Sequence, residues 1–572
     1  MEQFDFRRMS LYQIWIRSFA DGNGDGIGDL YGVYDRLEYI KSLGVDGIWF
    51  SPIYPSPNAD YGYDISDYRN IHPDYGTLDQ FDRVLHRAHE LGLKVILDLV
   101  INHTSDEHPW FRESRKGRDN PYSDYYIWRD PKPTPGGHRP PNNWFSQFEG
   151  LAWEYEPQRE QYYLHVFAKK QPDLNMDNPK VREEVKAIMR FWLDRGVDGF
   201  REDVITFISK DQRLPDGIPF LPVINGMPFY KDGPNLMQYL REFRQVAQEY
   251  GALQIGEAPM TPVKTAIGYL CGEDRVLDMM IQFDTMMADC FLTEFVHLPF
   301  RLRKLKRAFS RWQYALAGRG WNALYLENHD HPRVISRYGS EKYWRESGTM
   351  LAACYLFQQG TPFIYQGQEI GMTNIRLDTI DKYIDIASIR AYHAYFTRQS
   401  QEKRMRRIHR SSRDSARTPV QWTDGPNAGF TTGTPWFHVN PNYTAVNVAA
   451  EEGDPNSILN FYRRCLALRK SSETLLSGTY QEYQAWRGKV YMYERSRQGE
   501  RILIVCSFSH LAQSYRLPRG YDRAGAELLL DNYPEAPALG KLRPYEAQVY
   551  RCWVDRSKQR PYNNSCYATY GA

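Results

Sequence analysis

The chain has 572 residues, which exceeds one ordinary domain but suits a large barrel with appended parts. Its formal net charge is only +2, and it has no basic tract and no apolar run that could span a bilayer, so neither nucleic acid nor a membrane is an expected partner. The first residues lack an apolar signal core, and 7 scattered cysteines suit reduced thiols, so a cytoplasmic protein is expected.

The first predicted strand, 11–16, is followed by a polar loop rich in Asp and Gly. Between Asp21 and Asp29 this loop places oxygen-bearing side chains at alternate positions, which is the spacing of a calcium-binding loop. The twelfth position is Gly32 instead of glutamate and no helix precedes the loop, so it is not a complete EF-hand. The pattern predicts a structural Ca²⁺ site, and the alternative is a plain turn that binds nothing.

Apolar runs and helical patterns then alternate along most of the chain. Predicted helices include 31–43, 78–91, 236–250 and 458–470, and the helix over 181–194 ends before Gly196, which can adopt a left-handed cap. Eight strand–helix units predict a closed (β/α)8 barrel. The predicted strands cover 11–16, 47–50, 93–103, 199–204, 254–257, 276–283, 324–330 and 361–369.

Four of these strands carry an acid toward their carboxyl ends: Asp98, Asp203, Glu257 and Asp330. Successive strand residues point to opposite faces, so Arg201 shares a face with Asp203. A carboxylate beside a cation stays ionised and can act as a nucleophile. One such pair alone would read as a structural ion pair, but the ends of barrel strands converge on a single mouth, where the chemistry sits.

Five motifs in sequence order resemble those of the α-amylase superfamily, glycoside hydrolase family 13. Four resemble its signature regions, and one resembles the extra region of its oligo-1,6-glucosidase branch. The first four are Asp98-x-x-x-x-His103, Gly199-Phe200-Arg201-x-Asp203, Gly256-Glu257 and Asn328-His329-Asp330, and the fifth is Gln171-Pro172-Asp173-Leu174-Asn175.

The resemblance extends over nearly the whole chain and implies its domain organisation. The barrel is expected at 1–103 and 176–480, with a lid, domain B, inserted after the third strand at 104–175. A second insertion, 371–455, follows the eighth strand. The last part, 481–572, is expected to form a C-terminal β-sandwich domain.

The resemblance also implies roles for individual residues. Asp203 is the expected nucleophile, kept charged by Arg201; Glu257 is the expected acid/base, and Asp330 is expected to grip sugar hydroxyls. Asp98 is expected to orient Arg201 and Tyr63. Retention of anomeric configuration predicts that the carboxyls of Asp203 and Glu257 lie roughly 5–5.5 Å apart.

The resemblance further predicts a binding site for one terminal glucose, gripped by both Asp60 and Arg417, and the Ca²⁺ ligands. The expected substrate-binding residues are Asp60, Tyr63, His103, Phe145, Phe167, Gln171, Arg201, Val204, His329 and Arg417. The expected Ca²⁺ ligands are Asp21, Asn23, Asp25, Asp29 and the carbonyl of Ile27. No organic cofactor is expected.

The predicted function is a retaining, exo-acting α-glucosidase on short isomaltose-like α-glucosides, expected to be a monomer. It would release terminal α-1,6-linked glucose, with α-1,4-linked glucose as a second substrate. Val204, one residue after the nucleophile, favours the α-1,6 linkage, whereas Thr206 departs from the asparagine that is usual in the branch. Glu202 and Glu327 add carboxylates near the predicted site.

Two alternatives use the same scaffold. A sucrose isomerase or transglucosylase resembles this chain but carries Arg-Leu-Asp-Arg-Asp after strand six, and the stretch assigned to that position, 300–306, does not match. A non-catalytic relative, such as a transporter heavy subunit, needs a membrane anchor and tolerates loss of the catalytic acids. This sequence predicts no anchor and keeps all three acids.

Overall fold

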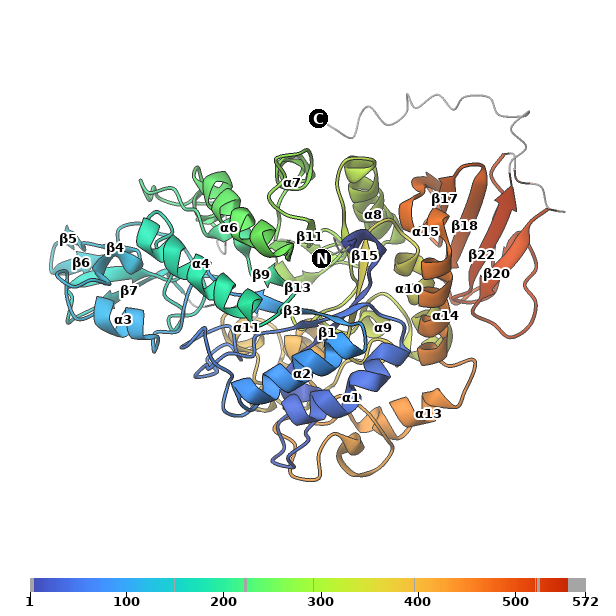
Figure 1. Cartoon of the computed structure of the whole chain (residues 1–572), viewed down its shortest axis with the longest axis horizontal. Helices are drawn as coiled ribbons and strands as arrows, with labels where there is room; N and C mark the ends of the chain where they lie inside the picture. The colour runs from blue at the N-terminus through green and yellow to red at the C-terminus, as the bar shows by residue number, and fades with distance from the viewer. Residues whose placement is uncertain are drawn as a thin grey trace.

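The computed structural model describes residues 5–553, apart from 149, 221–223, 292, 396, 520 and 522–524. A barrel occupies the middle of the molecule, the strands of 104–175 lie at one end, and an antiparallel sheet lies at the other (Figure 1). None of the described helices is both long and apolar enough to span a membrane. Six cysteines are free thiols, and Cys566 lies outside the described residues.

Eight parallel strands form the barrel, in the order β11-β10-β9-β3-β2-β1-β15-β14. Contacts between β11 and β14 bring the two edges together, so the predicted (β/α)8 barrel is confirmed. Almost every strand residue is buried, as expected for strands covered by side chains on one face and helices on the other. The strands are β1 (Leu11–Ile14), β2 (Gly47–Phe50), β3 (Lys94–Leu99), β9 (Gly199–Glu202), β10 (Leu253–Ala258), β11 (Met279–Gln282), β14 (Ala323–Leu324) and β15 (Thr361–Tyr365).

One long helix follows each strand along the described chain. Thr77 and Gln80 form a reciprocal capping box at the start of α2, and Gly251 ends α6 in the left-handed conformation, with φ 66°. Gly196 beyond α4 is also left-handed, as its position predicts, with φ 103°. These helices are α1 (Leu30–Ser42), α2 (Leu78–Glu90), α4 (Pro179–Asp194), α6 (Leu236–Tyr250), α7 (Val263–Leu270), α8 (Leu302–Leu316), α10 (Trp344–Leu356) and α14 (Ile458–Ser471).

Six of the eight predicted strands are shorter than expected, among them the last two. The seventh pairs with its neighbour only at Ala323 and Leu324, and the eighth ends at Tyr365. Beyond Leu324 the backbone bonds to side chains instead of to a neighbouring strand. For example, the Asp330 N–H donates to Asn328 Oδ1 at 2.9 Å. Asp330 therefore lies in a loop after β14 and not on a strand.

The stretch 104–175 is more ordered than its irregular sequence predicts. It contains a three-stranded sheet in the order β4-β8-β7, a β5–β6 hairpin and the short helix α3. Its core includes Trp144 and Trp153, packed with Phe207 and Tyr230 from the segment after β9. These elements are α3 (Pro109–Ser114), β4 (Trp128–Arg129), β5 (Lys132–Thr134), β6 (Gly137–Arg139), β7 (Trp153–Glu156) and β8 (Gln161–Leu164).

The C-terminal part is an antiparallel five-stranded sheet in the order β16-β17-β18-β22-β20, packed through Tyr515 and Leu542 against the small β19–β21 sheet. It begins at Thr479, two residues before the predicted boundary, and the predicted residues 554–572 lie outside the described part. Its strands are β16 (Thr479–Tyr483), β17 (Val490–Arg497), β18 (Glu500–Ser507), β19 (Gln513–Ser514), β20 (Glu527–Asp531), β21 (Lys541–Leu542) and β22 (Ala547–Trp553).

Short elements follow the barrel strands or lie in the insertion after β15. They are α5 (Met227–Tyr230), β12 (Cys290–Phe291), β13 (Thr293–His297), α9 (Val334–Arg337), α11 (Ile386–Arg390), α12 (Gln401–Ser411) and α13 (Val448–Glu452). A further short helix, α15 (Glu473–Ser477), follows α14 and contacts β17 and β18.

Candidate active site

Three neighbouring barrel strands bring acids to one level of the mouth. Parallel pairing places Asp98 of β3 on one side of Arg201 and Ile255 of β10 on the other. Glu257 lies two residues beyond Ile255 on the same strand face, and Asp203 lies one residue past the end of β9. The acids predicted from separate motifs therefore meet at one place.

The buried Arg201 guanidinium links these acids. Its Nη1 lies 2.6 Å from Asp98 Oδ1 and 2.7 Å from Asp203 Oδ1, and its Nη2 lies 2.5 Å from Glu257 Oε1. The Tyr63 hydroxyl donates to the other oxygen of Asp98 at 3.0 Å. The predicted contacts of Asp98 with Arg201 and Tyr63 are thus present, and through them Asp98 fixes both side chains.

Three carboxyls compete for that single guanidinium. Burial raises the pKa of Asp203 well above its usual range; Arg201 opposes the shift, while Glu257 and Asp98 add to it. Burial also raises the pKa of Asp98, again against Arg201. Arg201 therefore favours the charged form of Asp203, while burial and the two neighbouring acids favour its protonated form. One protonated and one ionised carboxyl is the state that an acid and a nucleophile need.

Val204 follows Asp203 in a left-handed backbone conformation, with φ 36° and ψ 43°. This region is strained for a β-branched residue and costs on the order of 1–3 kcal/mol. The conformation directs the Val204 N–H to Glu257 Oε2 at 3.1 Å, and the buried side chain lines the cavity. The strain therefore orients Glu257 and shapes the wall beside the nucleophile.

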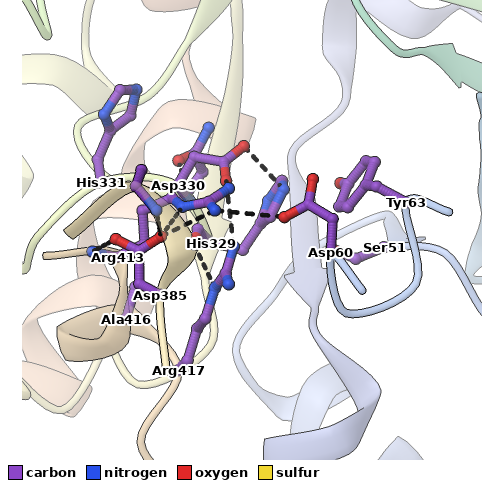
Figure 2. A network of polar contacts seen from close by, with 12 residues as sticks. Ser51, Asp60, Tyr63, His329, Asp330, His331, Asp385, Arg413, Ala416 and Arg417 are labelled. Carbon is purple, nitrogen blue, oxygen red and sulfur yellow. Dashed lines mark hydrogen bonds and ion pairs between the residues drawn. The ribbon is translucent and has the colours of Figure 1, made fainter. Parts of the chain in front are cut away.

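Asp330 lies in a network of basic groups (Figure 2). Its Oδ2 is 2.9 Å from His329 Nε2, and its Oδ1 is 3.1 Å from Arg413 Nη1 and 3.4 Å from Arg417 Nη2. Burial opposes ionisation, but His329, Arg413 and Arg417 together hold the pKa of Asp330 well below its usual range. Asp330 is therefore an anion at neutral pH.

The sequence predicted that Arg417 binds the same glucose as Asp60, and the structure brings a second arginine, Arg413, to Asp60. Arg413 Nη2 lies 3.2 Å from Asp60 Oδ1, and Arg413 lines the cavity. Arg417 instead donates to the His329 carbonyl at 3.3 Å and packs over Trp15, outside the cavity lining. The chain makes a 3-10 turn over Arg413–Ala416, so Arg413 reaches the cavity wall while Arg417 contacts Asp330 from outside the lining. The signal for Arg413 was its position four residues before the recognised motif.

Gln13 and Tyr63 fix the orientation of the His329 imidazole. The side-chain amide of Gln13 donates to its Nδ1 at 2.8 Å, which leaves the proton on Nε2, the nitrogen that faces Asp330. Its ring stacks on that of Tyr63, with centroids 5.2 Å apart and planes at 6°. His329 therefore supports Tyr63 and Asp330 and does not itself line the cavity.

A cavity of about 230 Å³ opens over this cluster. Five of its lining residues are acidic, and Arg413 is the only Lys or Arg among the described residues that line it. Predicted residues on the wall are Asp60, Tyr63, His103, Phe167, Asp203, Val204, Glu257 and Asp330; further ones include Phe148, Phe207, Met260, Phe283, Glu294, Phe295 and Arg413.

Besides Arg201, His329 and Arg417, two more predicted substrate-binding residues are absent from this wall. Phe145 lies in a bridge with Leu151, donates its N–H to Asn225 and is outside the cavity lining, whereas Phe148 lines the cavity. Gln171 is buried behind the wall, where its amide lies 3.3 Å from Asp60 Oδ2 and 3.0 Å from His103 Nε2.

The remaining lid-side group, His103, is neutral at pH 7, because burial lowers its pKa to about 4. It can therefore contribute hydrogen bonds but no charge to a bound sugar.

Glu202 and Glu327 are near the site but outside its lining. Glu202 points away from the barrel axis and accepts a bond from Gln254 at 2.7 Å, and burial raises its pKa to about 7. Glu327 pairs with Arg333 at 3.3 Å and accepts the Val334 N–H. Both glutamates have structural contacts, and no effect on selectivity is apparent from them.

The Asp-rich loop lies between β1 and α1. Asp21 accepts N–H groups from Asn23, Gly24 and Gly26, and Asp29 caps α1 through Gly32 at 2.7 Å. Among the described residues, the carboxylates of this loop do not gather within reach of one ion. In this conformation the carboxylates accept hydrogen bonds from backbone N–H groups, so the Ca²⁺ site stays a prediction.

The structure does bring together Asp289, Cys290 and His297, the one described cluster with metal-ligand spacing. Two guanidiniums already neutralise Asp289, from Arg337 at 2.6 Å and Arg410 at 3.1 Å. Burial raises the pKa of the Cys290 thiol to about 12, so no thiolate is available at neutral pH. The cluster therefore anchors the β12–β13 hairpin through Arg337 and Arg410.

The chain was compared with known proteins. It is 46% identical to the oligo-1,6-glucosidase of Parageobacillus thermoglucosidasius over 562 residues, which covers 96% of this chain and 99% of that protein. The solved trehalose-6-phosphate hydrolase of Bacillus licheniformis has a TM-score of 0.90 at 41% identity, covering 96% of this chain and all of that one. The trehalulose synthase MutB from Pseudomonas mesoacidophila MX-45 also has a TM-score of 0.90 at 41% identity, with coverages of 96% and 99%.

The model of the α-amylase catalytic domain matches residues 13–478, which include all of the barrel strands except the first two residues of β1. Fold, motifs and full-length relatives agree, and the chain belongs to the α-amylase family, glycoside hydrolase family 13.

Proposed function

We propose that this chain is a retaining, exo-acting α-glucosidase that removes terminal α-1,6-linked glucose from short oligosaccharides. The observation that carries the proposal is the single guanidinium of Arg201 in contact with both Asp203 and Glu257. Such a pair supplies the two carboxyls that glycoside hydrolysis requires, and the lowered pKa of Asp330 keeps a third, anionic carboxyl beside them.

In the first half of the reaction an Asp203 oxygen attacks the anomeric carbon. The bond from that carbon to the leaving oxygen breaks as Glu257 donates its proton to that oxygen. Arg201 and Tyr63 hold Asp98 and Asp203 in place, and the Asp330 anion stabilises the positive charge that develops on the sugar ring.

In the second half Glu257, now ionised, takes a proton from water. The water oxygen attacks the anomeric carbon and displaces Asp203, which returns to its free carboxylate form. Two inversions restore the original configuration. This mechanism predicts, as before, that the carboxyls of Asp203 and Glu257 lie roughly 5–5.5 Å apart.

Exo action is supported by the closed end of the cavity. Arg413 joins Asp60 at 3.2 Å to Asp330 at 3.1 Å, so charged groups that can bind the hydroxyls of a terminal glucose fill the space where further sugar units would lie. Asp60, Arg413 and Asp330 form this glucose clamp. The fully buried Asp385 lies 2.8 Å from Arg413 and fixes its position.

The α-1,6 preference is supported by Val204 and by relatives named oligo-1,6-glucosidases at 42–46% identity. The Val204 side chain has restricted rotation about χ1, and its backbone is in the strained left-handed region. It lines the cavity beside the nucleophile. Thr206, which departs from the usual asparagine, is buried outside the cavity lining and leaves this support intact.

Sucrose isomerisation is the second candidate, since a trehalulose synthase is similar over the full chain. The loop after strand six is 283–301, because β11 ends at Gln282 and α8 begins at Leu302, so the stretch 300–306 was the wrong one to compare. The correct loop also lacks Arg-Leu-Asp-Arg-Asp, which favours hydrolysis.

The test is product analysis with isomaltose, maltose, sucrose and panose under identical conditions. We expect free glucose from isomaltose and panose, released first as the α-anomer in proton NMR. Isomeric disaccharides as the main product from sucrose, or release of the β-anomer, would overturn the proposal.

A further inference from the structure

The β12–β13 hairpin forms one wall of the cavity and carries an acid that the catalytic mechanism does not use. Glu294, on β13, lines the cavity together with Thr293 and Phe295. Its side chain is 33% exposed, so its carboxyl is accessible from the cavity.

Glu294 faces the cavity across the barrel from Asp60, whereas its contact with His331, 3.7 Å away, places it on the same side as Asp330. The hairpin follows β11, whereas Asp60 follows β2, and three strands separate β2 from β11 in either direction around the barrel. The hairpin also adjoins β10, the strand that carries Glu257, because β10 and β11 pair. Glu257 protonates the leaving oxygen, so this wall borders the leaving group.

The hairpin is held firmly at its base. Asp289 binds Arg337 at 2.6 Å and Arg410 at 3.1 Å, and its carbonyl accepts the Leu298 N–H at 2.7 Å. These contacts tie the hairpin to α9 and α12 and use both arginines at a distance from the cavity lining. The position of Glu294 is therefore set before a substrate binds.

No cation neutralises Glu294 at close range. Within ion-pair distance, its partner among the described residues is His331, with Nδ1 at 3.7 Å, and burial lowers the pKa of His331 to about 3, so it is neutral. The cavity's one guanidinium, Arg413, already binds Asp60, Asp330 and Asp385.

Burial raises the pKa of Glu294 to about 7, with Asp330 and Asp385 adding to the shift and Arg337 and Arg413 opposing it. The side chain is therefore a carboxylate or a neutral carboxyl, and never a positive group. It can accept hydrogen bonds from sugar hydroxyls but cannot neutralise a phosphate, which is bound mainly by Arg and Lys.

We infer that Glu294 is a specificity-determining residue that selects hydroxyl-bearing, neutral leaving groups and rejects leaving sugars that carry a phosphate. The inference rests on the proposed α-glucosidase function and names the chemistry of its leaving-group side. A phosphate on the leaving sugar would face Glu294, whose described ion-pair partner is the neutral His331, and like charges close together disfavour binding.

The test compares trehalose 6-phosphate with isomaltose at about pH 8, where the carboxylate form of Glu294 dominates. The quantity measured is the ratio of the two kcat/KM values, in wild type, Glu294→Gln and Glu294→Lys. We expect Glu294→Gln to raise this ratio by about 3-fold and Glu294→Lys by at least about 10-fold, the latter weakening as salt is added.

Glu273→Lys is the matched control, because Glu273 is exposed after α7 and lies outside the cavity lining. It changes the net charge equally and is expected to leave the ratio unchanged. Glu294→Gln is nearly the same size as the native residue, so it serves if Glu294→Lys does not fold.

Binding of both disaccharides to Asp203→Asn protein, with and without Glu294→Gln, gives a second readout that needs no turnover. If wild type hydrolyses no α-glucoside, the proposed function is wrong. The ratio of the binding affinities of the two disaccharides would still test the role of Glu294. A wild type that prefers trehalose 6-phosphate, or a ratio that Glu294→Gln and Glu294→Lys leave unchanged, would overturn the inference.

Discussion

At the scale of single residues, Asp203 and Glu257 contact one guanidinium yet need opposite protonation states. Asp203→Asn and Glu257→Gln should each reduce kcat for isomaltose by about 10²–10⁴-fold or more. In Glu257→Gln the rate of glucosyl-enzyme formation should fall less with 4-nitrophenyl α-glucoside than with isomaltose, because 4-nitrophenol leaves without a proton donor. Only Asp203→Asn should prevent formation of the glucosyl-enzyme, measured by mass spectrometry with a fluorinated glucosyl donor. Near-normal turnover by either folded variant would contradict the assignment.

Arg413 and Arg417 offer a matched pair of substitutions. Arg413 faces the cavity and binds three carboxylates, whereas Arg417 is buried against Trp15. Arg413→Lys should lower kcat/KM for 4-nitrophenyl α-glucoside by about 100-fold, since lysine cannot make the same forked contacts. Arg417→Lys should mainly lower the melting temperature. A larger loss of kcat/KM in Arg417→Lys would show that the arginine predicted from the sequence grips the glucose after all.

Val204 provides a test of linkage preference. Its branched side chain cannot easily rotate away, so a bulky 4-linked sugar is expected to be crowded there while the extra rotatable bond of a 1,6 linkage lets the leaving sugar clear it. One or two misplaced methyl groups correspond to about 10- to 200-fold in discrimination. We expect kcat/KM for isomaltose to exceed that for maltose, and Val204→Thr to narrow the difference. Wild-type enzyme that favours maltose would exclude Val204 as the determinant.

At the scale of secondary-structure elements, the register of β3 against β9 sets the proton affinity of the site. It places Asp98 beside Arg201, so Asp98 competes for the guanidinium and adds to the rise in the pKa of Asp203 that burial mainly causes. The nucleophile must be ionised, so the acidic limb of kcat/KM should lie at higher pH than for an ordinary aspartate. Asp98→Asn removes one anion, lowers that pKa and should move the limb to lower pH while kcat falls. An acidic limb that stays in place would mean that Asp98 acts through geometry alone.

At the scale of the whole molecule, the Asp-rich loop connects the start of the barrel to the insertion after β15. Asp21 donates its N–H to the Phe430 carbonyl at 3.0 Å, and Trp436 donates to the Gly26 carbonyl at 2.9 Å. Ca²⁺ bound there would stabilise this junction by about 2.7 kcal/mol when present at 100 times its Kd. A chelator should therefore lower the melting temperature more than it lowers kcat.

The control for that experiment is Asp25→Asn, since Asp25 is exposed and bonds only within the loop. This variant should melt at the chelated temperature whether or not calcium is added. Equal melting temperatures for wild type with chelator and with calcium would favour the plain turn.

The sequence by itself determined the barrel, the order of its strands and the acids at its mouth. The physical reason is local: period-2 and period-3.6 patterns define elements, and parallel barrel strands must bring their carboxyl ends together. Asp98, Arg201, Asp203 and Glu257 lie on or next to such strands, so their meeting follows from strand position alone.

Only the tertiary structure decided which loop residues line the cavity. Arg413 and Arg417 are equally basic, and Phe145 and Phe148 are the same residue type, so composition and spacing do not separate them. Their directions depend on contacts with distant segments, such as Arg413 with Asp60 and Phe145 with Asn225. Glu294 was likewise invisible to motif reasoning, because its exposure to the cavity depends on a hairpin that Asp289 ties to arginines far along the chain.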